Sequence, residues 1–165
     1  PVTLPRENAR RAELEQRQRI DIEQPALVRA TAGEEPEVTA ERLFERCREA
    51  SKKLSDELLD CYSITARITL RAGSDKAKRQ LSGGEYKLAL RKALAHQRYV
   101  GDVVDWIDAD FEREGGAVRV TATRSTARSP ETYPQSWLVG PGADSGWRIL
   151  EEDGNGWPDP APAVR

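Results

Sequence analysis

The sequence contains no methionine, a single histidine (His96) and two cysteines (Cys47 and Cys61). No apolar run approaches the roughly 20 residues that a helix needs to cross a bilayer, so we predict no membrane span in this chain. The 26 basic and 28 acidic residues nearly cancel, which argues against a general nucleic-acid-binding protein. Hydrophobic residues make up 38% and charged residues 33% of the 165, so we expect one domain with a core and some chain outside it.

The chain begins at Pro1, which together with the missing methionine indicates a processed chain or a piece excised from a longer one. A secretion signal or lipid anchor removed upstream would fit, and loss of an initiator methionine is the simpler alternative. The basic charge comes from 20 arginines and only 6 lysines, which hints at a GC-rich bacterial genome. We therefore expect a bacterial protein in the periplasm or outside the cell, with the cytoplasm as the alternative.

An even number of cysteines in an exported chain permits one disulfide, between Cys47 and Cys61. On one straight helix the two would lie about 21 Å apart, whereas a disulfide needs Cα atoms within about 7 Å. The bridge forms only if the chain reverses between them, near Ser51 to Ser55, and we predict that it does. Neither cysteine has a histidine cluster beside it, so we predict no zinc site.

The first 36 residues have the composition of a charged helical arm and a linker. Every aromatic residue lies at or after Phe44, so the arm can supply little core. Residues 7–22 carry acidic and basic residues at helical ion-pair spacing but only a thin apolar stripe, and residues 29–37 have the composition of a linker. We expect residues 1–36 to be dispensable for folding and to serve association.

Periodicity divides the middle of the chain into helices and a strand. A helix is expected from near Thr39, which can cap it, and its apolar residues recur at three- and four-residue steps from Leu43 as far as Leu58. Residues 62–70 alternate apolar and polar with β-branched side chains, which predicts a strand, and the rival interpretation extends the helix to about Ala72. Residues 71–84 are expected to form a basic loop, and residues 85–98 a helix.

The remainder is expected to form an antiparallel meander. Gly115-Gly116 is a two-residue hairpin signal. Pairing about it places Phe111 opposite Val120 and Ala109 opposite Ala122 inside, with Glu112 opposite Arg119 outside. Residues 133–139 and 146–151 are two further expected strands, and residues 154–165 an irregular tail.

The closing stretch, Trp137-Leu138-Val139 followed by Gly146-Trp147-Arg148-Ile149, resembles the last hairpin of the nuclear-transport-factor-like (cystatin-like, polyketide-cyclase-like) superfamily. The resemblance covers about residues 40–152. It implies an α+β domain at 37–153, in which helices pack on a twisted antiparallel β-meander shaped as a cone. This superfamily hosts isomerases, dehydratases, cyclases, secretion-system parts and plain binding modules, so the resemblance implies a fold and not a function.

Leu81-Ser82-Gly83-Gly84-Glu85 resembles the signature motif of ABC-type ATPases, in which a serine and backbone amides at a helix N-terminus bind a γ-phosphate. That chemistry also needs a GxxxxGK[ST] loop to hold the phosphates, and the sequence contains none. We therefore interpret the motif as a turn before a helix with Ser82 as a nearby cap, and predict no ATP hydrolysis.

Titratable residues give few candidates for catalysis. In cone-shaped relatives a carboxylate and a tyrosine facing the cavity can do acid–base work on a small apolar substrate, and Asp105 with Tyr133 or His96 is the set that fits here. The non-catalytic interpretation of His96 is a structural or exposed histidine, since no G-x-S-x-G elbow is present. The non-catalytic interpretation of residues 102–110 is a solvated acidic edge, because their spacing is not that of a Ca²⁺ loop. We predict no metal and no cofactor.

Between Arg67 and Arg98 there are nine basic and two acidic residues, with no aromatic interleaved at residues 76–79. This pattern does not support nucleic-acid stacking. It favours a basic face, including Arg79 and Arg91, that contacts an acidic partner or the acidic parts of this chain. Trp157 in the tail is either an interaction anchor or folds back on the sheet.

Two functions remain open. The leading hypothesis is a non-enzymatic, exported bacterial binding or assembly module that acts through protein contacts, with a protein partner or a second copy. The alternative is a small-molecule site in the cone, which binds a hydrophobic ligand or catalyses an isomerase- or dehydratase-type proton transfer. Converging titratable groups in a closed apolar pocket would favour the alternative, and a filled cone with an exposed apolar patch on the sheet would favour the first.

Overall fold

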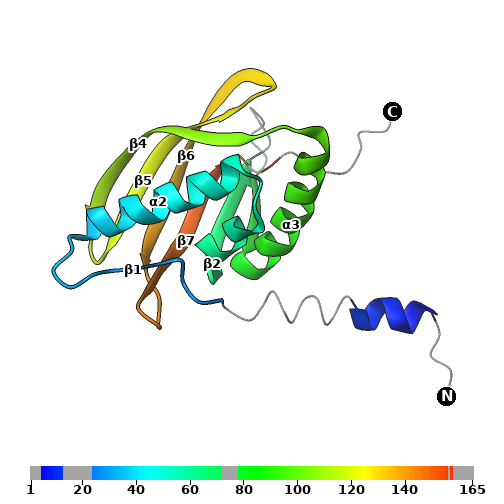
Figure 1. The fold of residues 1–165 in the computed structure, drawn as a ribbon, viewed down its shortest axis with the longest axis horizontal. Coiled ribbons are helices and arrows are strands. Elements are labelled where there is room, and N and C mark those ends of the chain that lie inside the picture. Colours follow the sequence, from blue (N-terminus) through cyan, green and yellow to red (C-terminus); the bar gives the residue numbers. More distant parts are fainter. Residues whose placement is uncertain (1–4, 13–23, 72–77, 156, 158–165) are drawn as a thin grey trace.

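Figure 1 shows a computed structural model of the chain, which describes residues 5–12, 24–71, 78–155 and 157. Helix α2 lies across one face of a twisted sheet, and α3 lies beside β2. The elements are β1 (Val28–Arg29), α2 (Pro36–Lys52), the 3-10 helix η1 (Asp56–Cys61), β2 (Tyr62–Arg71), β3 (Lys78–Ser82), α3 (Gly83–Val100), β4 (Val104–Glu114), β5 (Ala117–Thr126), β6 (Ser129–Pro141) and β7 (Gly146–Asn155). The α+β class and the helix-on-sheet arrangement are confirmed.

The seven strands form one mixed sheet in the order β3-β2-β7-β6-β5-β4, with β1 pairing to β7. Strands β4 to β7 are the predicted antiparallel meander. Strand β2 joins it by pairing in parallel with β7, a long-range contact that makes the sheet mixed. The sheet therefore has β3 at one edge and β4 at the other.

The hairpin at Gly115-Gly116 has the predicted register at its end, with Phe111 opposite Val120 and Glu112 opposite Arg119. The predicted pairing of Ala109 with Ala122 falls in a bulge that the sequence did not predict: Ile107 pairs with Thr123 and Asp110 with Thr121, so Asp108 and Ala109 together face Ala122. A residue with positive φ, Asp108 at 56°, lies within this bulge. The extra residue reverses the alternation, so Trp106 is buried at 2% exposure whereas Ile107 is 36% exposed.

Helix α2 begins at Pro36, not at Thr39, because proline fits the first helical turn, where no N–H partner is needed. Thr39 is a buried helical residue whose hydroxyl donates to Glu34 at 2.7 Å. The helix ends at Lys52, and Leu58 belongs to η1. The apolar residues predicted to share one face of a single helix are therefore divided between α2 and η1. The reversal between them brings the Cα atoms of Cys47 and Cys61 to 6.1 Å, and the predicted disulfide is present.

Residues 62–71 form strand β2, as the alternation predicts, and not a continued helix. The predicted loop over residues 71–84 is wrong in its second half, because residues 78–82 form β3, an antiparallel edge strand beside β2, and α3 begins at Gly83. The polar sequence of β3 has no apolar alternation, and an edge strand needs none. Ser82 then caps α3: its Oγ accepts from the Glu85 amide at 3.2 Å, and the Glu85 carboxylate accepts from the Ser82 amide at 3.0 Å.

Gly83 is required by the packing of α3 on β2. A Cβ at this position would lie 1.9 Å from the carbonyl oxygen of Ser63, so only glycine allows the helix to start there. The helix extends to Val100 and ends at Gly101 with φ of 75°. The glycines of the LSGGE motif therefore have a structural reason to be present.

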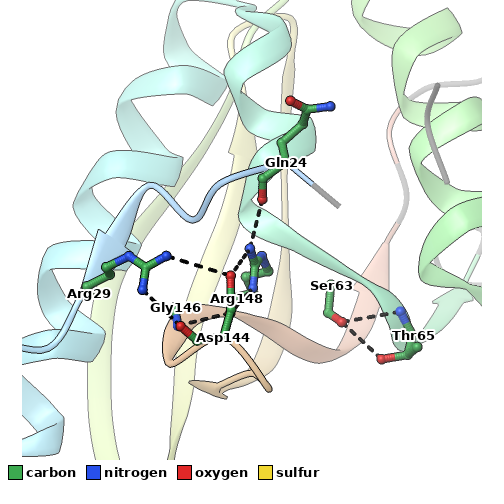
Figure 2. Close-up of polar contacts among 7 residues, drawn as sticks. All are labelled: Gln24, Arg29, Ser63, Thr65, Asp144, Gly146 and Arg148. Atoms are coloured by element: carbon green, nitrogen blue, oxygen red, sulfur yellow. Dashed lines mark hydrogen bonds and ion pairs between the residues drawn. The ribbon is translucent and has the colours of Figure 1, made fainter. Parts of the chain in front are cut away.

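The N-terminal segment from Gln24 packs on the domain. Strand β1 pairs with the start of β7, and Val28 is 5% exposed. Figure 2 shows how Arg148 binds both Asp144 and the carbonyl oxygen of Gln24, each at 2.8 Å. The predicted division of the chain at residue 36 thus stays a prediction about folding, which truncation can test.

The two ends of the chain are described only in part. Residues 5–12 are helical and exposed, and residues 13–22 of the predicted arm helix lie outside the described residues. Strand β7 continues to Asn155, two residues into the predicted irregular tail. Trp157 is partly buried against the core, which fits the alternative that it folds back on the sheet.

The centre of the core is filled by aromatic rings. Phe44 of α2 lies with its ring centroid 5.7 Å from both Phe111 and Trp137, and Trp106 lies 5.1 Å from Trp137. The apolar space left beside these rings measures about 10 Å³. A volume of this size holds at most one water molecule, so the helix-covered side of the sheet is packed and not hollow here.

Candidate functional site

The sheet has one face covered by helices and one that is open. Ala66, Ile68, Val120 and Trp137 are buried in the core under the helices, so the residues that alternate with them point the other way. No helix or strand among the described residues covers that second side, which we call the open face. It carries a groove of about 1090 Å³ that spans β2, β3, β5, β6 and β7.

Most of the residues that line the groove are polar or charged. Much of its lining is threonine, serine and glutamine, and its charged residues are Arg67, Arg71, Arg119, Glu151, Asp153 and the buried Glu152. Antiparallel sheets often keep one face solvated in this way. The open face is therefore not the apolar patch that the sequence analysis associated with a binding module.

Ion pairs join strands across the open face. Glu151 lies between Arg67, which it binds directly, and Arg119, whose guanidinium is 3.5 Å away. Arg119 also binds Glu114 at 3.0 Å. Such exposed pairs contribute little stability each, but they fix where the guanidinium groups lie.

A further pair on this face joins Arg71 Nε to Asp153 Oδ1 at 3.1 Å, and this hydrogen bond raises the pKa of Arg71. Three arginines thus stand beside three carboxylates, counting Glu114, and the charges of the open face nearly cancel.

Directly behind the groove lies a buried polar cluster centred on Glu152 of β7, which is 2% exposed. The Tyr62 hydroxyl donates to Glu152 Oε1 at 2.6 Å, and Trp137 Nε1 donates to the same oxygen at 2.5 Å. Tyr86 of α3 packs edge-on against Tyr62, with ring centroids 5.0 Å apart. One carboxyl therefore joins β7, β2 and β6 beneath α3.

Burial dominates the electrostatics of this cluster. It raises the pKa of Glu152, although hydrogen bonds from Tyr62 and Trp137 oppose the shift. It also holds the pKa of both Tyr62 and Tyr86 well above the ordinary value. Arg124, 6% exposed, has its pKa lowered by burial, with Tyr86 and Glu152 opposing. The folded protein thus favours a neutral Glu152 more than water does.

The groove reaches the cluster where two strands separate. Pairing between β6 and β7 ends at Ser136 and Asp153. Beyond it, β6 continues against β5 alone and β7 continues against β2 alone. We call this gap the fork. The Gln135 side chain fills it against Gly154, where a Cβ would lie 2.7 Å from Gln135 Cδ.

The residues predicted for acid–base chemistry, Asp105, Tyr133 and His96, lie on β4, β6 and α3. Asp105 binds Arg48 of α2 at 2.8 Å; burial opposes its ionisation, but hydrogen bonds from Arg48 and the Trp106 amide lower its pKa. The Tyr133 hydroxyl donates to Glu131, and that bond raises the pKa of Tyr133. His96 is half-buried on α3. Within the described part of the chain, no hydrogen bond or ion pair joins any two of Asp105, Tyr133 and His96.

The residues predicted for interaction lie on different elements. Arg79 is exposed on the edge strand β3, and Arg91 is half-buried on α3. In the described ranges, no group of three or more His, Cys, Asp or Glu side chains is placed to hold a metal ion. No described helix is both long and apolar enough to cross a membrane.

Sequence reasoning missed Glu152. The pairing of β6 with β7 slips by one residue, because Val139 lies opposite Ile149 whereas Leu138 lies opposite Glu151. Simple alternation from Ile149 would therefore place Glu152 outside, and the bulge turns it inside. A signal was present all the same: Tyr62 and Tyr86 fall on predicted buried faces, and buried hydroxyls need an acceptor.

Comparison with known proteins identifies the fold. No protein-family model and no curated protein matches the chain. An NTF2-like protein of unknown function from Pseudomonas putida KT2440 superposes with a TM-score of 0.55 and 10% identity over 76% of this chain and 87% of its own. A putative dehydratase of the NTF2-like family from Streptomyces avermitilis superposes with a TM-score of 0.56 and 13% identity, over 73% of this chain and 95% of its own.

An NTF2-like protein with a cystatin-like fold from Novosphingobium aromaticivorans covers 94% of this chain and 92% of its own, at a TM-score of 0.50 and 11% identity. These likenesses agree with the resemblance seen in the closing hairpin. The protein therefore has the NTF2-like, cystatin-like α+β fold. At such low identity they establish the fold alone.

Proposed function

We propose that this chain is an exported bacterial binding module that takes a protein partner in the groove of the open face. The observation that carries the proposal is the contrast in free space. The open face offers about 1090 Å³, whereas the apolar space under α2 measures about 10 Å³. A protein segment fits the larger space, and a hydrophobic ligand has no room in the smaller.

The charges of the open face suit a polypeptide of mixed charge. Its arginines and carboxylates alternate across the strands and nearly cancel, so neither a polyanion nor a strongly basic partner is favoured. The Arg67 side chain is 82% exposed and can reach a partner while it stays near Glu151. The disulfide between Cys47 and Cys61 supports an oxidising compartment such as the periplasm.

The proposal is tested with two variants that alter the groove and one matched control. Arg67→Glu reverses a charge in the groove, and Thr121→Arg fills its floor. Lys92→Glu makes the same charge reversal as the first on the exposed side of α3. Proteins retained from an extract of the source organism are identified by mass spectrometry, and the dissociation constant for each purified candidate is then measured.

We expect a partner that binds the unaltered protein and Lys92→Glu alike, and binds both groove variants at least about tenfold more weakly, a loss of about 1.4 kcal/mol. Equal binding by all four proteins would show that the partner uses another surface. Retention of no protein at all would contradict the proposal outright.

The alternative of an isomerase- or dehydratase-type site in the cone has less support. In the described part of the chain no hydrogen bond or ion pair joins Asp105, Tyr133 and His96, and the aromatic rings around Phe44 fill the space that a substrate would need. One similar structure is a putative dehydratase, but a shared fold at 13% identity does not carry an activity across.

A further inference from the structure

Two buried oxygen atoms at the fork have no hydrogen-bond partner. They are Glu152 Oε2 and Gln135 Oε1, and both side chains are at least nine-tenths buried. Buried polar atoms are nearly always paired, because leaving one unpaired costs its full desolvation energy. Two such atoms on neighbouring strands, in residues that both line the groove, therefore need a chemical explanation.

The other Glu152 oxygen shows what Oε2 can offer. Oε1 already accepts from both Tyr62 and Trp137, so a proton on this carboxyl belongs on Oε2. Burial favours that protonated form, since it raises the pKa of Glu152. When Glu152 is protonated, its Oε2 is a donor, and Gln135 Oε1 is an acceptor that belongs to the side chain filling the fork.

We propose that the fork binds a small uncharged amide, whose carbonyl oxygen accepts from Glu152 Oε2 and whose N–H donates to Gln135 Oε1. A carboxamide presents an acceptor and a donor side by side, which matches this pair. A charged ligand is disfavoured, because burying an unpaired charge is costly.

The chain contains a model for this contact. The Gln135 side chain is itself a primary carboxamide, and its hydrogen bond to the Glu152 carboxyl opposes the rise in the pKa of Glu152 that burial causes. Gly154 is what admits it, because a Cβ there would collide with Gln135. The fork thus already accommodates the amide group that the proposal assigns to the ligand.

The probe is benzamide, added to the full chain and followed by the indole N–H signal of Trp137 in an NMR spectrum. This signal reports on Glu152 because Trp137 Nε1 donates to it. Acetophenone has a similar shape but no N–H donor, and benzoate carries a charge. We expect a saturable shift with benzamide at a dissociation constant of about 1 mM, ordinary for so small a ligand, and at least tenfold weaker binding of the other two.

Variants separate this site from other causes. Gln135→Leu removes the acceptor and Gly154→Ala crowds the fork, and each should weaken benzamide binding at least tenfold while the Trp137 signal and the cooperative melt persist. Lys92→Glu should leave benzamide binding unchanged, because Lys92 lies on the exposed side of α3 and belongs neither to the fork nor to the groove. The site is thereby tested independently of the protein partner.

Three results would overturn the proposal. No saturable shift with benzamide would show that a protonated Glu152 donates directly to Gln135 and that the pair is closed. Equal shifts with acetophenone would show apolar binding without amide recognition. Unchanged binding in Gln135→Leu and Gly154→Ala would place the ligand elsewhere.

Discussion

The two faces of the sheet use the same strands for different purposes. On the covered face, Val120 and Trp137 lie opposite each other and are at most 2% exposed. On the open face, their neighbours Thr121 and Ser136 also lie opposite each other, and both line the groove. One step along each strand therefore separates a residue that holds the fold from one that is available to a partner.

The comparison teaches where stability and recognition reside. Burial of aromatic rings contributes kilocalories per side chain, whereas exposed ion pairs contribute a fraction of one. Changes on the open face should then alter binding without unfolding the protein, and changes on the covered face should do the reverse. Four predictions test this division, from the largest expected effect to the smallest.

Phe44→Ala should lower the free energy of unfolding by about 3–5 kcal/mol, because it leaves a cavity between Trp137 and Phe111. Denaturant unfolding followed by tryptophan fluorescence measures the change. Arg67→Ala on the open face is the matched comparison and should cost less than about 1 kcal/mol. Similar losses in the two variants would abolish the distinction between the faces.

Replacing both Cys47 and Cys61 with alanine should lower stability by about 3 kcal/mol. The disulfide closes a loop of 14 residues, and opening it gives conformational freedom back to the unfolded chain. Thermal unfolding of the double variant and of the oxidised protein gives the difference. An intact mass that does not change on reduction of the unaltered protein would contradict the bridge itself.

A chain that begins at Glu37 should lose about 1.5–3 kcal/mol, because it lacks the buried Val28 and the β1–β7 pairing. The composition of residues 1–36 alone predicts little loss of stability, whereas the packing of Val28 in the structure predicts a measurable one. This truncation therefore distinguishes the two predictions. A chain that begins at Gln24 is the control, and it should melt like the full chain. Equal melting temperatures for the two truncations would restore the boundary at residue 36.

The contribution of Glu152 to the free energy of unfolding should depend on pH, and we expect it to be smaller than the three effects above. Burial raises the pKa of Glu152 above its ordinary value of 4.5 in the folded state, so folding favours the protonated carboxyl. We compare the free energies of unfolding of the unaltered protein and of Glu152→Gln. The advantage of the unaltered protein should be largest below about pH 4.5 and should shrink as the pH rises through the pKa of Glu152 in the folded state.

Denaturant titrations of both proteins at a series of pH values measure that difference. Arg42, which holds the pKa of Glu34 at about 2, gives the protein an opposite trend in acid, but both proteins share it and it cancels. A difference that grows as the pH rises would contradict the shift assigned to Glu152.

Much of the local structure could be read from the sequence, because its causes lie within a few residues. Alternation from Tyr62 to Leu70 indicated strand β2, and the Gly115-Gly116 turn set the register of Phe111 against Val120. Ser82 with Glu85 forms the cap that starts α3. Each of these signals is local, so no distant contact was needed to interpret it.

The candidate sites depended on distant contacts. One bulge turns Trp106 inward and Ile107 outward, and another turns Glu152 inward beside Tyr62. A bulge adds one residue opposite a partner strand, so it exists only in the pairing and reverses every face beyond it. The parallel pairing of β2 with β7, and with it the fork at Gln135, likewise forms only when the folded chain brings residues 62–71 and 149–155 together. Local periodicity indicated most of the strands, although not β3, and tertiary pairing decided which side chains are buried wherever a bulge shifts the register.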